Sequence, residues 1–190
     1  GNVFFVGHPM IDLTKKLPSK EVSRTILKLR ANQNILLLMP ASRPQELKYI
    51  LPTFLKTAKK LQLRYPSLIV YIPSCRKVFD EKFRKGLEKY EIKGKVISQQ
   101  DDSELMPYIY SLTKLALCKS GTVNMELALY GVPQIIGYRV SRVTAFIAKR
   151  ILNFKVRFIS PVNLLMKKFI IPEFVQKNFN EKKIFFKACR

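Results

Sequence analysis

The sequence is poor in the residues that most catalytic and metal sites use. Its 190 residues include one histidine, three cysteines and no tryptophan, and no two cysteines form a Cys-x-x-Cys pair. The three cysteines are far apart in the sequence, at Cys75, Cys118 and Cys189, and their number is odd. This pattern gives no support to a disulfide framework or a zinc knuckle. We therefore expect reduced thiols, with no metal and no cofactor.

Glycine-rich phosphate motifs of the Walker or dinucleotide type are also missing, which argues against a kinase, a GTPase or an NAD-dependent dehydrogenase. No apolar run approaches the about 18 residues of a membrane-spanning helix, and no signal peptide is visible. These absences predict a soluble or peripheral protein.

Acidic residues are scarce: 13 Asp and Glu stand against 35 Lys and Arg, for a net charge of +22 at pH 7. This balance indicates an anionic partner, such as nucleic acid, acidic phospholipid headgroups or phosphorylated substrates. The lysines are scattered and form no block or arginine-rich tail. A lysine-rich solvated surface would explain the same composition.

Short apolar runs alternate with amphipathic stretches along the chain. The runs predict strands at residues 3–6, 35–39, 68–72, 96–97, 115–117 and 134–138. Helical spacing predicts helices at residues 20–30, 42–61, 76–90, 102–113, 122–130 and 142–152. Near-continuous apolar strands that alternate with helices indicate a doubly wound, parallel, Rossmann-like α/β sheet. We expect this unit to occupy residues 1–160, followed at 161–190 by an extended segment and a terminal helix.

Helix starts and breaks can also be predicted locally. Ser42 with Gln45 three residues later matches a capping box, with Pro44 tolerated in the first turn. Pro52 should kink or split the same helix, and Asp102 is the expected N-cap of a later one.

The turn Ser120-Gly121-Thr122 is the most informative segment for function. It follows an apolar strand and opens a helix, and ligands of doubly wound sheets bind at such strand-to-helix turns. Free backbone N–H groups and the positive helix end would favour an anion there. Glu126, one turn later, could accept hydrogen bonds from a sugar diol. Ordinary helix capping explains the same turn.

Other polar residues allow two interpretations each. Arg43 could fork onto a diphosphate or pair with Glu46 on the surface. His8 has no Ser or Cys partner in view, which favours a turn histidine over a catalytic one. Asp101 and Asp102 are adjacent, and neighbouring side chains seldom aim at one substrate atom.

Two later segments are ambiguous as well. Residues 142–152 combine apolar side chains with Arg142, Lys149 and Arg150, so they could lie on an anionic membrane or form a core helix with basic ends. Asn163, in the loop after Pro161, could serve a ligand or a turn.

Several motifs, each weak alone, occur in an order that is specific for one family: Gly7-His8-Pro9-Met10-Ile11-Asp12, Pro40-Ala41-Ser42-Arg43-Pro44-Gln45-Glu46, Arg64-Tyr65-Pro66, Ser120-Gly121-Thr122 with Glu126, Tyr138-Arg139 and Asn163-Leu164. With these motifs most of the chain resembles the carboxyl-terminal domain of lipid-A-disaccharide synthase, an inverting glycosyltransferase of the GT-B fold.

The resemblance implies transfer of a diacylglucosamine from its UDP carrier to diacylglucosamine-1-phosphate, which forms the lipid A disaccharide. It implies that Ser120-Gly121-Thr122 would face the diphosphate and Glu126 the ribose hydroxyls. Arg43 would counter the leaving-group charge, and Asn163 would line the cleft. GT-B enzymes usually need no metal, because a helix dipole and basic side chains stabilise the departing UDP.

Two departures from the family pattern accompany the resemblance. Ala41 stands where the family loop usually has glycine, which would weaken the site if that position needs φ > 0 or close approach to phosphate. The amino-terminal domain, expected to bind the acceptor and supply the general base, is absent from this sequence. We expect it as a partner, and without it UDP binding but no turnover.

The amphiphilic donor and acceptor would also give the positive charge a use. Scattered lysines would hold a cytoplasmic, peripheral enzyme to the inner face of a membrane, at about 1 kcal/mol for each residue near the surface. The alternatives are another GT-B UDP-sugar enzyme and a basic nucleic-acid-binding module. The eight tyrosines and thirteen phenylalanines mostly follow hydrophobic periodicity, which argues against nucleic acid as a partner.

Overall fold

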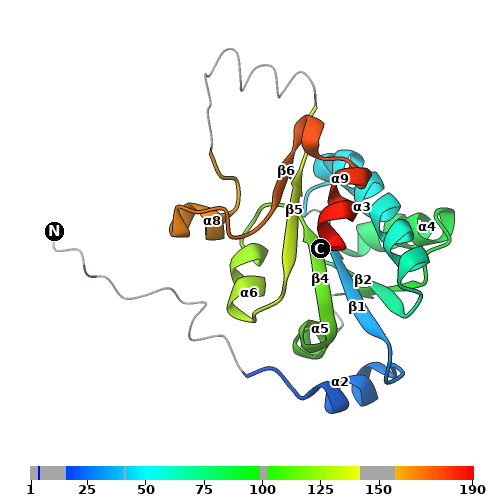
Figure 1. Ribbon diagram of the computed structural model, residues 1–190. Helices are drawn as coiled ribbons and strands as arrows, with labels where there is room; N and C mark the ends of the chain where they lie inside the picture. Colours follow the sequence, from blue (N-terminus) through cyan, green and yellow to red (C-terminus); the bar gives the residue numbers. More distant parts are fainter. Residues whose placement is uncertain (1–3, 5–15, 41, 99–101, 142–156) are drawn as a thin grey trace.

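A six-stranded parallel sheet in the order β3-β2-β1-β4-β5-β6 forms the centre of the molecule (Figure 1). The computed structural model describes residues 4, 16–40, 42–98, 102–141 and 157–190. Its strands are β1 (Asn34–Met39), β2 (Leu68–Ser74), β3 (Gly94–Ser98), β4 (Thr113–Cys118), β5 (Gln134–Tyr138) and β6 (Glu173–Val175). The strand order reverses between β1 and β4, which is the topological switch point of a doubly wound sheet. The predicted Rossmann-like fold is confirmed.

Strand β1 shows why the strands are nearly continuous apolar runs. Successive side chains point to opposite faces of a strand. Leu36 and Leu38 join the core on one face, while Ile35 and Leu37 join the core on the other. Because helices cover both faces, the four residues in the middle of this strand are all buried and apolar.

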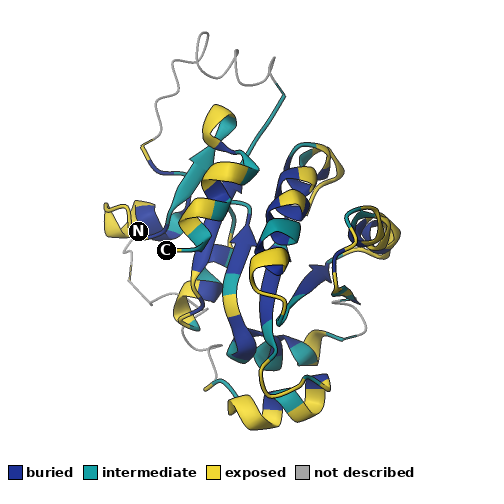
Figure 2. Ribbon diagram, turned by 45° about the vertical axis from the view of Figure 1, so that its right-hand side comes forward, coloured by how far each residue is buried: buried dark blue, intermediate teal, exposed yellow. Residues whose placement is uncertain are grey.

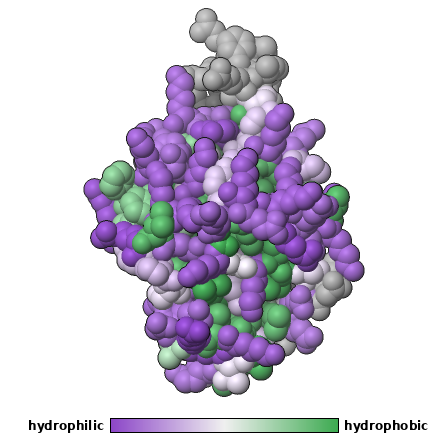
Figure 3. All heavy atoms as spheres, turned by 90° about the vertical axis from the view of Figure 1, so that its right-hand side faces the viewer, coloured by the Kyte–Doolittle hydropathy of each residue, from purple (hydrophilic) through white to green (hydrophobic). Residues whose placement is uncertain are grey.

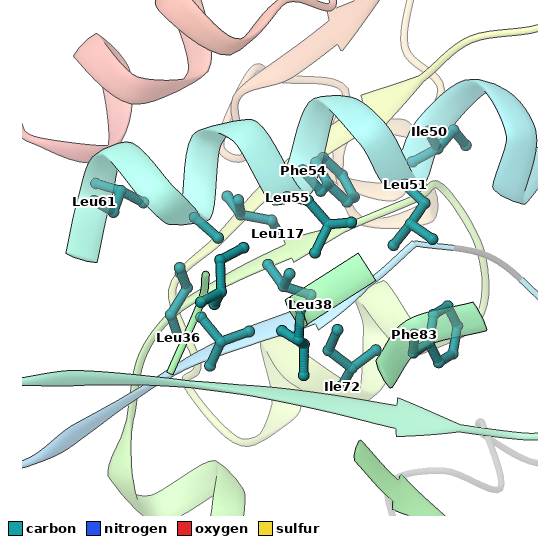
Figure 4. Packing of buried hydrophobic residues seen from close by; sticks show 14 of the residues in the cluster. Leu36, Leu38, Ile50, Leu51, Phe54, Leu55, Leu61, Ile72, Phe83 and Leu117 are labelled. Atoms are coloured by element: carbon teal, nitrogen blue, oxygen red, sulfur yellow. The ribbon is translucent and has the colours of Figure 1, made fainter. Parts of the chain in front are cut away.

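The first face is covered by α3 (Pro44–Arg64), α4 (Lys77–Lys89) and α9 (Glu181–Ala188). Leu51 and Leu55 of α3 point toward Leu36 and Leu38 of β1 (Figure 4). Phe179 precedes α9 and meets the Phe54 ring edge-on, with centroids 5.4 Å apart.

The second face is covered by α2 (Lys20–Leu27), α5 (Met106–Leu112), α6 (Val123–Leu129) and α8 (Pro161–Met166). Two short 3-10 helices, η1 (Ser103–Leu105) and η3 (Gln176–Asn178), complete the described elements. Burial is greatest in the central strands, and exposed residues lie mainly on the outer sides of the helices (Figure 2). Within the described ranges, no helix has the length and apolarity needed to cross a membrane.

The predicted capping box at the start of α3 is wrong. The N-cap is Arg43 instead of Ser42, and its side chain makes no capping hydrogen bond. Pro44 fixes the first helical residue one position later than predicted, because its ring presets a helical φ. Pro52 lies inside the 21-residue helix and does not split it.

The helix start at Asp102 and the last 30 residues differ in part from the sequence predictions. Asp102 is the N-cap of η1, not directly of α5, and its side chain makes no capping hydrogen bond. The last 30 residues contain α8, then β6 as an extended segment of the same sheet, and α9 as the terminal helix. The predictions at residues 142–152, His8, Ala41 and Asp101 lie outside the described residues. Of the strand predicted at residues 3–6, only Phe4 is described.

Candidate functional site

Two loops meet where the strand order reverses. One follows β1 and leads into α3, and the other follows β4 and leads into α6. Met39 and Cys118 are partners in the register of these neighbouring strands, and the Lys119 N–H donates to the Met39 carbonyl over 3.0 Å. Parallel strands bring their carboxyl ends to one edge, so Arg43 and the Ser120-Gly121-Thr122 turn lie on the same rim.

An ion pair joins the two loops. Lys119 Nζ donates to both carboxylate oxygens of Glu46, at 2.8 and 2.7 Å, and the two side chains are only 17% and 14% exposed. This contact ties the β4–α6 loop to the first turn of α3. Glu46 therefore pairs with Lys119, and not with Arg43 as the alternative interpretation of the sequence proposed.

Arg43 is exposed at the start of α3 and has no acidic partner among the described residues. The first helical residue, Pro44, has no N–H, and the Glu46 N–H donates to the Arg43 carbonyl over 3.2 Å. The Gln45 N–H has no partner among the described residues, because α3 has no side-chain cap. An arginine at an uncapped helix N-terminus provides a planar donor next to a positive dipole end, which is a favourable arrangement for a phosphate.

The Ser120-Gly121-Thr122 turn uses some of its donors internally. Ser120 Oγ donates to the Ile159 carbonyl, and the Gly121 N–H donates to Asn124 Oδ1 over 2.8 Å. The N–H groups of Thr122 and Val123 have no partner within the described part of the chain. The donors left for an anion are thus fewer than the sequence predicted.

Asn124 holds this turn in place, and sequence reasoning missed it. It is fully buried, and its Nδ2 lies 3.2 Å from Cys118 Sγ, the Lys119 carbonyl and Gln134 Oε1. Gln134 Nε2 returns a bond to the Asn124 carbonyl over 2.9 Å. The sequence signal for this role is the pair of amides, Asn124 at a core-facing position of α6 and Gln134 at the start of β5.

The only carboxylate in α6 is partly engaged. Glu126 is half-buried, and its Oε1 accepts a 3.1 Å bond from the Tyr110 hydroxyl. Burial, followed by the charge of Glu126, raises the pKa of Tyr110 well above its usual value. Tyr110 therefore stays protonated and donates, which fixes the carboxylate and leaves its second oxygen without a partner among the described residues.

Asn163 does not have a free side chain for a ligand, contrary to the prediction that it lines the cleft. It is fully buried, and its Nδ2 donates to the Ile171 carbonyl and Glu173 Oε1 at 2.7 and 2.8 Å. Its Oδ1 accepts from the N–H groups of Ile170 and Ile171, both at 2.9 Å. A carboxamide has two donor hydrogens and two lone pairs, and all four are used here.

Cys118, which ends β4 beside these loops, does not present a reactive thiol. Cys118 is buried at the end of β4, and burial raises the pKa of its thiol to about 12. Cys75, Cys118 and Cys189 are all free thiols. Among the described residues, no group of three or more His, Cys, Asp and Glu side chains could hold a metal ion.

Two solved structures that share this fold are glycosyltransferases. The chain superposes on E. coli ADP-heptose lps heptosyltransferase II with a TM-score of 0.61 and 9% identity, covering 90% of this chain and 50% of that one. It superposes on the C-terminal domain of a glycosyl transferase group 1 family protein from Francisella tularensis with a TM-score of 0.58 and 12% identity, covering 94% and 85%. Identities this low establish the fold alone, one Rossmann-like half of the GT-B architecture.

Sequence comparison is more specific. Lipid-A-disaccharide synthase from Prochlorococcus marinus (strain MIT 9313) is 49% identical over 174 residues, covering 92% of this chain and 44% of the relative. The enzyme of that name from Synechocystis sp. is 37% identical over 177 residues, covering 93% and 44%. The chain spans less than half the length of these relatives. The family described as lipid-A-disaccharide synthetase matches residues 2–190, and this chain belongs to it.

Proposed function

We propose that this chain is the UDP-sugar-binding half of a glycosyltransferase. The enzyme would move a diacylglucosamine from UDP to diacylglucosamine-1-phosphate and so form the lipid A disaccharide. Membership of the family supports this reaction. The observation that carries the nucleotide-binding role is the pair of uncapped helix starts, α3 and α6, which follow neighbouring strands at the switch point and are joined by the Lys119–Glu46 ion pair.

The groups at these helix starts suit a diphosphate. Arg43 would form a bidentate contact with phosphate oxygens, and the N–H groups of Thr122 and Val123 would donate to the same anion. A Cβ added at Gly121 would meet only Lys119 Cε, at 3.6 Å, so internal packing leaves room for a ligand at this turn. When the glycosidic bond breaks, negative charge grows on UDP, and these donors with two helix dipoles would stabilise it.

Glu126 would select the ribose. Its Oε1 is held by Tyr110, and its other oxygen would accept a hydrogen bond from a ribose hydroxyl. Ser120, whose hydroxyl bonds Ile159, would contribute to the shape of the turn and leave direct donation to its neighbours. The acceptor site and the general base would lie in the remaining half of the enzyme.

We further propose that the enzyme works in the cytoplasm on the inner face of a membrane. Donor and acceptor both carry acyl chains, and a net charge of +22 would attract the protein to anionic headgroups. The reaction would then take place where its amphiphilic substrates reside.

Calorimetric titration of this chain with UDP tests the nucleotide site. Arg43→Ala should weaken binding by about tenfold to a hundredfold, since a hydrogen bond to a charged group contributes about 1.5–3 kcal/mol. Arg84→Ala, which removes another exposed arginine from α4, is the matched control and should leave the affinity unchanged.

Glu126→Gln separates ribose recognition from phosphate binding. We expect it to weaken UDP binding and to leave the much weaker affinity for pyrophosphate unchanged. A folded chain that does not bind UDP, or an equal loss in Arg43→Ala and Arg84→Ala, would contradict the proposed site.

A further inference from the structure

Exposed apolar side chains concentrate in one short segment, residues 164–170. Within the described ranges, this segment supplies five of the exposed large hydrophobic residues, each 50–66% exposed: Leu164, Leu165, Met166, Phe169 and Ile170. All seven residues of the segment are exposed. Single exposed apolar residues are ordinary on a protein surface, whereas a contiguous group marks an interaction surface.

The segment is held in a fixed conformation. Asn163 precedes it and binds its far end, accepting from the Ile170 and Ile171 N–H groups and donating to the Ile171 carbonyl. The Phe169 ring meets the buried Phe158 ring edge-on, with centroids 4.6 Å apart. A surface that is already ordered loses little conformational entropy when it binds.

The surroundings of the segment are basic. Lys167 and Lys168 lie among its apolar residues and are exposed. A neighbouring hollow of about 510 Å³ is lined by Ile170 together with apolar side chains and three cations, Lys114, Lys187 and Arg190, and its lining includes no acid.

The nearby carboxylate is turned inward. Glu173 accepts from the N–H groups of Ile159 and Ser160 at 2.8 and 2.9 Å, and from Asn163 Nδ2. Its charge is therefore used inside the loop. The exposed part combines apolar side chains with cations, which complements a bilayer surface of acyl chains beneath anionic headgroups.

We propose that segment 164–170 docks this chain on an anionic lipid bilayer. Leu165, Met166 and Phe169 enter the boundary between headgroups and acyl chains. Lys167 and Lys168 pair with lipid phosphates. This inference rests on the membrane association in the proposed function and names the surface responsible for it.

The docking segment is close in sequence to a residue that contacts the proposed nucleotide site. Ile159, whose carbonyl accepts from Ser120 Oγ, immediately precedes Ser160, the N-cap of α8. The chain thus links the start of α8, which precedes the docking segment, to the Ser120-Gly121-Thr122 turn.

The opposite side of the molecule provides the contrast. Hydrophilic side chains cover most of the face at the right of Figure 1, near α3 and α4, and apolar side chains cover a smaller area (Figure 3). Exposed apolar residues of these helices, such as Leu63 at 70% and Val78 at 73%, lie on different helices and form no consecutive group.

Vesicle co-sedimentation of this chain tests the proposal. With vesicles of phosphatidylcholine and phosphatidylglycerol in equal parts, Leu165→Ser/Phe169→Ser should lower the partition coefficient about tenfold or more, because each side chain loses a favourable transfer from water. Leu63→Ser/Val78→Ser, which removes two equally exposed apolar side chains elsewhere, should bind like the parent chain. Lys167→Ala and Lys168→Ala should each lower binding about fivefold at low salt and leave the weak binding to pure phosphatidylcholine unchanged.

UDP titration of the same variants separates the two proposals. We expect Leu165→Ser/Phe169→Ser to bind UDP like the parent chain, which also shows that it is folded. Equal vesicle binding by this variant and by the control would overturn the docking role of the segment and leave the nucleotide site intact. If the parent chain does not bind the vesicles, or if the variant instead abolishes self-association measured by sedimentation velocity, the segment is not a membrane surface.

Discussion

Helices α6 and α8 begin close together, linked by the bond from Ser120 Oγ to the Ile159 carbonyl, but their first turns differ in chemistry. Thr122, the N-cap of α6, makes no side-chain capping bond. Ser160, the N-cap of α8, accepts a 3.1 Å bond from the Asn163 N–H. One helix start keeps donors available, and the other satisfies them within the protein.

The buried amides beside these helix starts show the same division. Asn124 and Asn163 are both fully buried and both organise a loop. Asn124 shapes a turn whose remaining N–H groups face the rim, whereas Asn163 supports a loop whose side chains are apolar and exposed. Two buried amides thus support, within one molecule, the proposed nucleotide site and an exposed apolar surface.

The largest effect should come from Asn163→Ala. It leaves two N–H groups, one carbonyl and one Glu173 oxygen without their buried partner, which should cost about 3–5 kcal/mol in the free energy of unfolding. Urea denaturation measures the loss, and exposed Asn178→Ala is the control. UDP affinity of the folded fraction should be unchanged, and a specific loss of affinity would restore Asn163 to the ligand site.

Breaking the Lys119–Glu46 pair should have the next largest effect, now on the α6 side of the comparison. Lys119→Met leaves a mostly buried carboxylate unpaired and should cost about 1–3 kcal/mol in unfolding free energy. Adding Glu46→Gln should recover part of that loss, as measured by a double-mutant cycle. The exposed pair of Lys85 and Glu81 is the control, and Lys85→Met should have no measurable effect.

Tyr110→Phe should cost about 1 kcal/mol at neutral pH, because one hydrogen bond to Glu126 is lost. In the unfolded chain a tyrosine ionises near pH 10, whereas burial raises the pKa of Tyr110 in the folded chain. The unfolded state therefore binds fewer protons above about pH 10, and stability falls as pH rises. Thermal unfolding between pH 8 and about pH 11 should show a smaller decline in Tyr110→Phe than in Tyr65→Phe, its exposed control.

The smallest effects should come from the two N-caps. Ser160→Ala removes a capping bond and should cost about 1 kcal/mol, whereas Thr122→Ala should have almost no effect on stability. Thr122→Asp places a negative charge at the start of α6. It should therefore stabilise this helix and weaken UDP binding. Equal stability losses in Ser160→Ala and Thr122→Ala would contradict the distinction between the two helix starts.

The sheet was largely predictable from the sequence. Strands β1 and β5 match their predicted runs closely, because strands buried on both faces must be apolar throughout. The rules for doubly wound sheets also place the strand-to-helix turns at one edge of the sheet, where the nucleotide site is proposed. The capping prediction at Ser42 failed because Pro44 determines the first helical residue more strongly than a side-chain cap does.

The polar contacts of the site were much less predictable. Lys119 and Glu46 are 73 positions apart, and nothing in either local sequence indicates that they meet. Asn163 looked like a loop residue available to a ligand, since sequence alone does not show that Ile170, Ile171 and Glu173 return to it. Side chains whose roles depend on distant partners require the folded structure.

The position of β1 in the middle of the sheet has a consequence for synthesis of the chain. β1 pairs with β4, whose residues are made about 80 positions later, so one edge of β1 stays open during much of translation. Its residues Leu36, Leu37 and Leu38 are almost completely inaccessible in the folded state. Until Cys118 has left the ribosome, this strand presents an unpaired apolar edge that can join another nascent chain. Correct folding of this protein therefore depends on how long that edge stays unprotected.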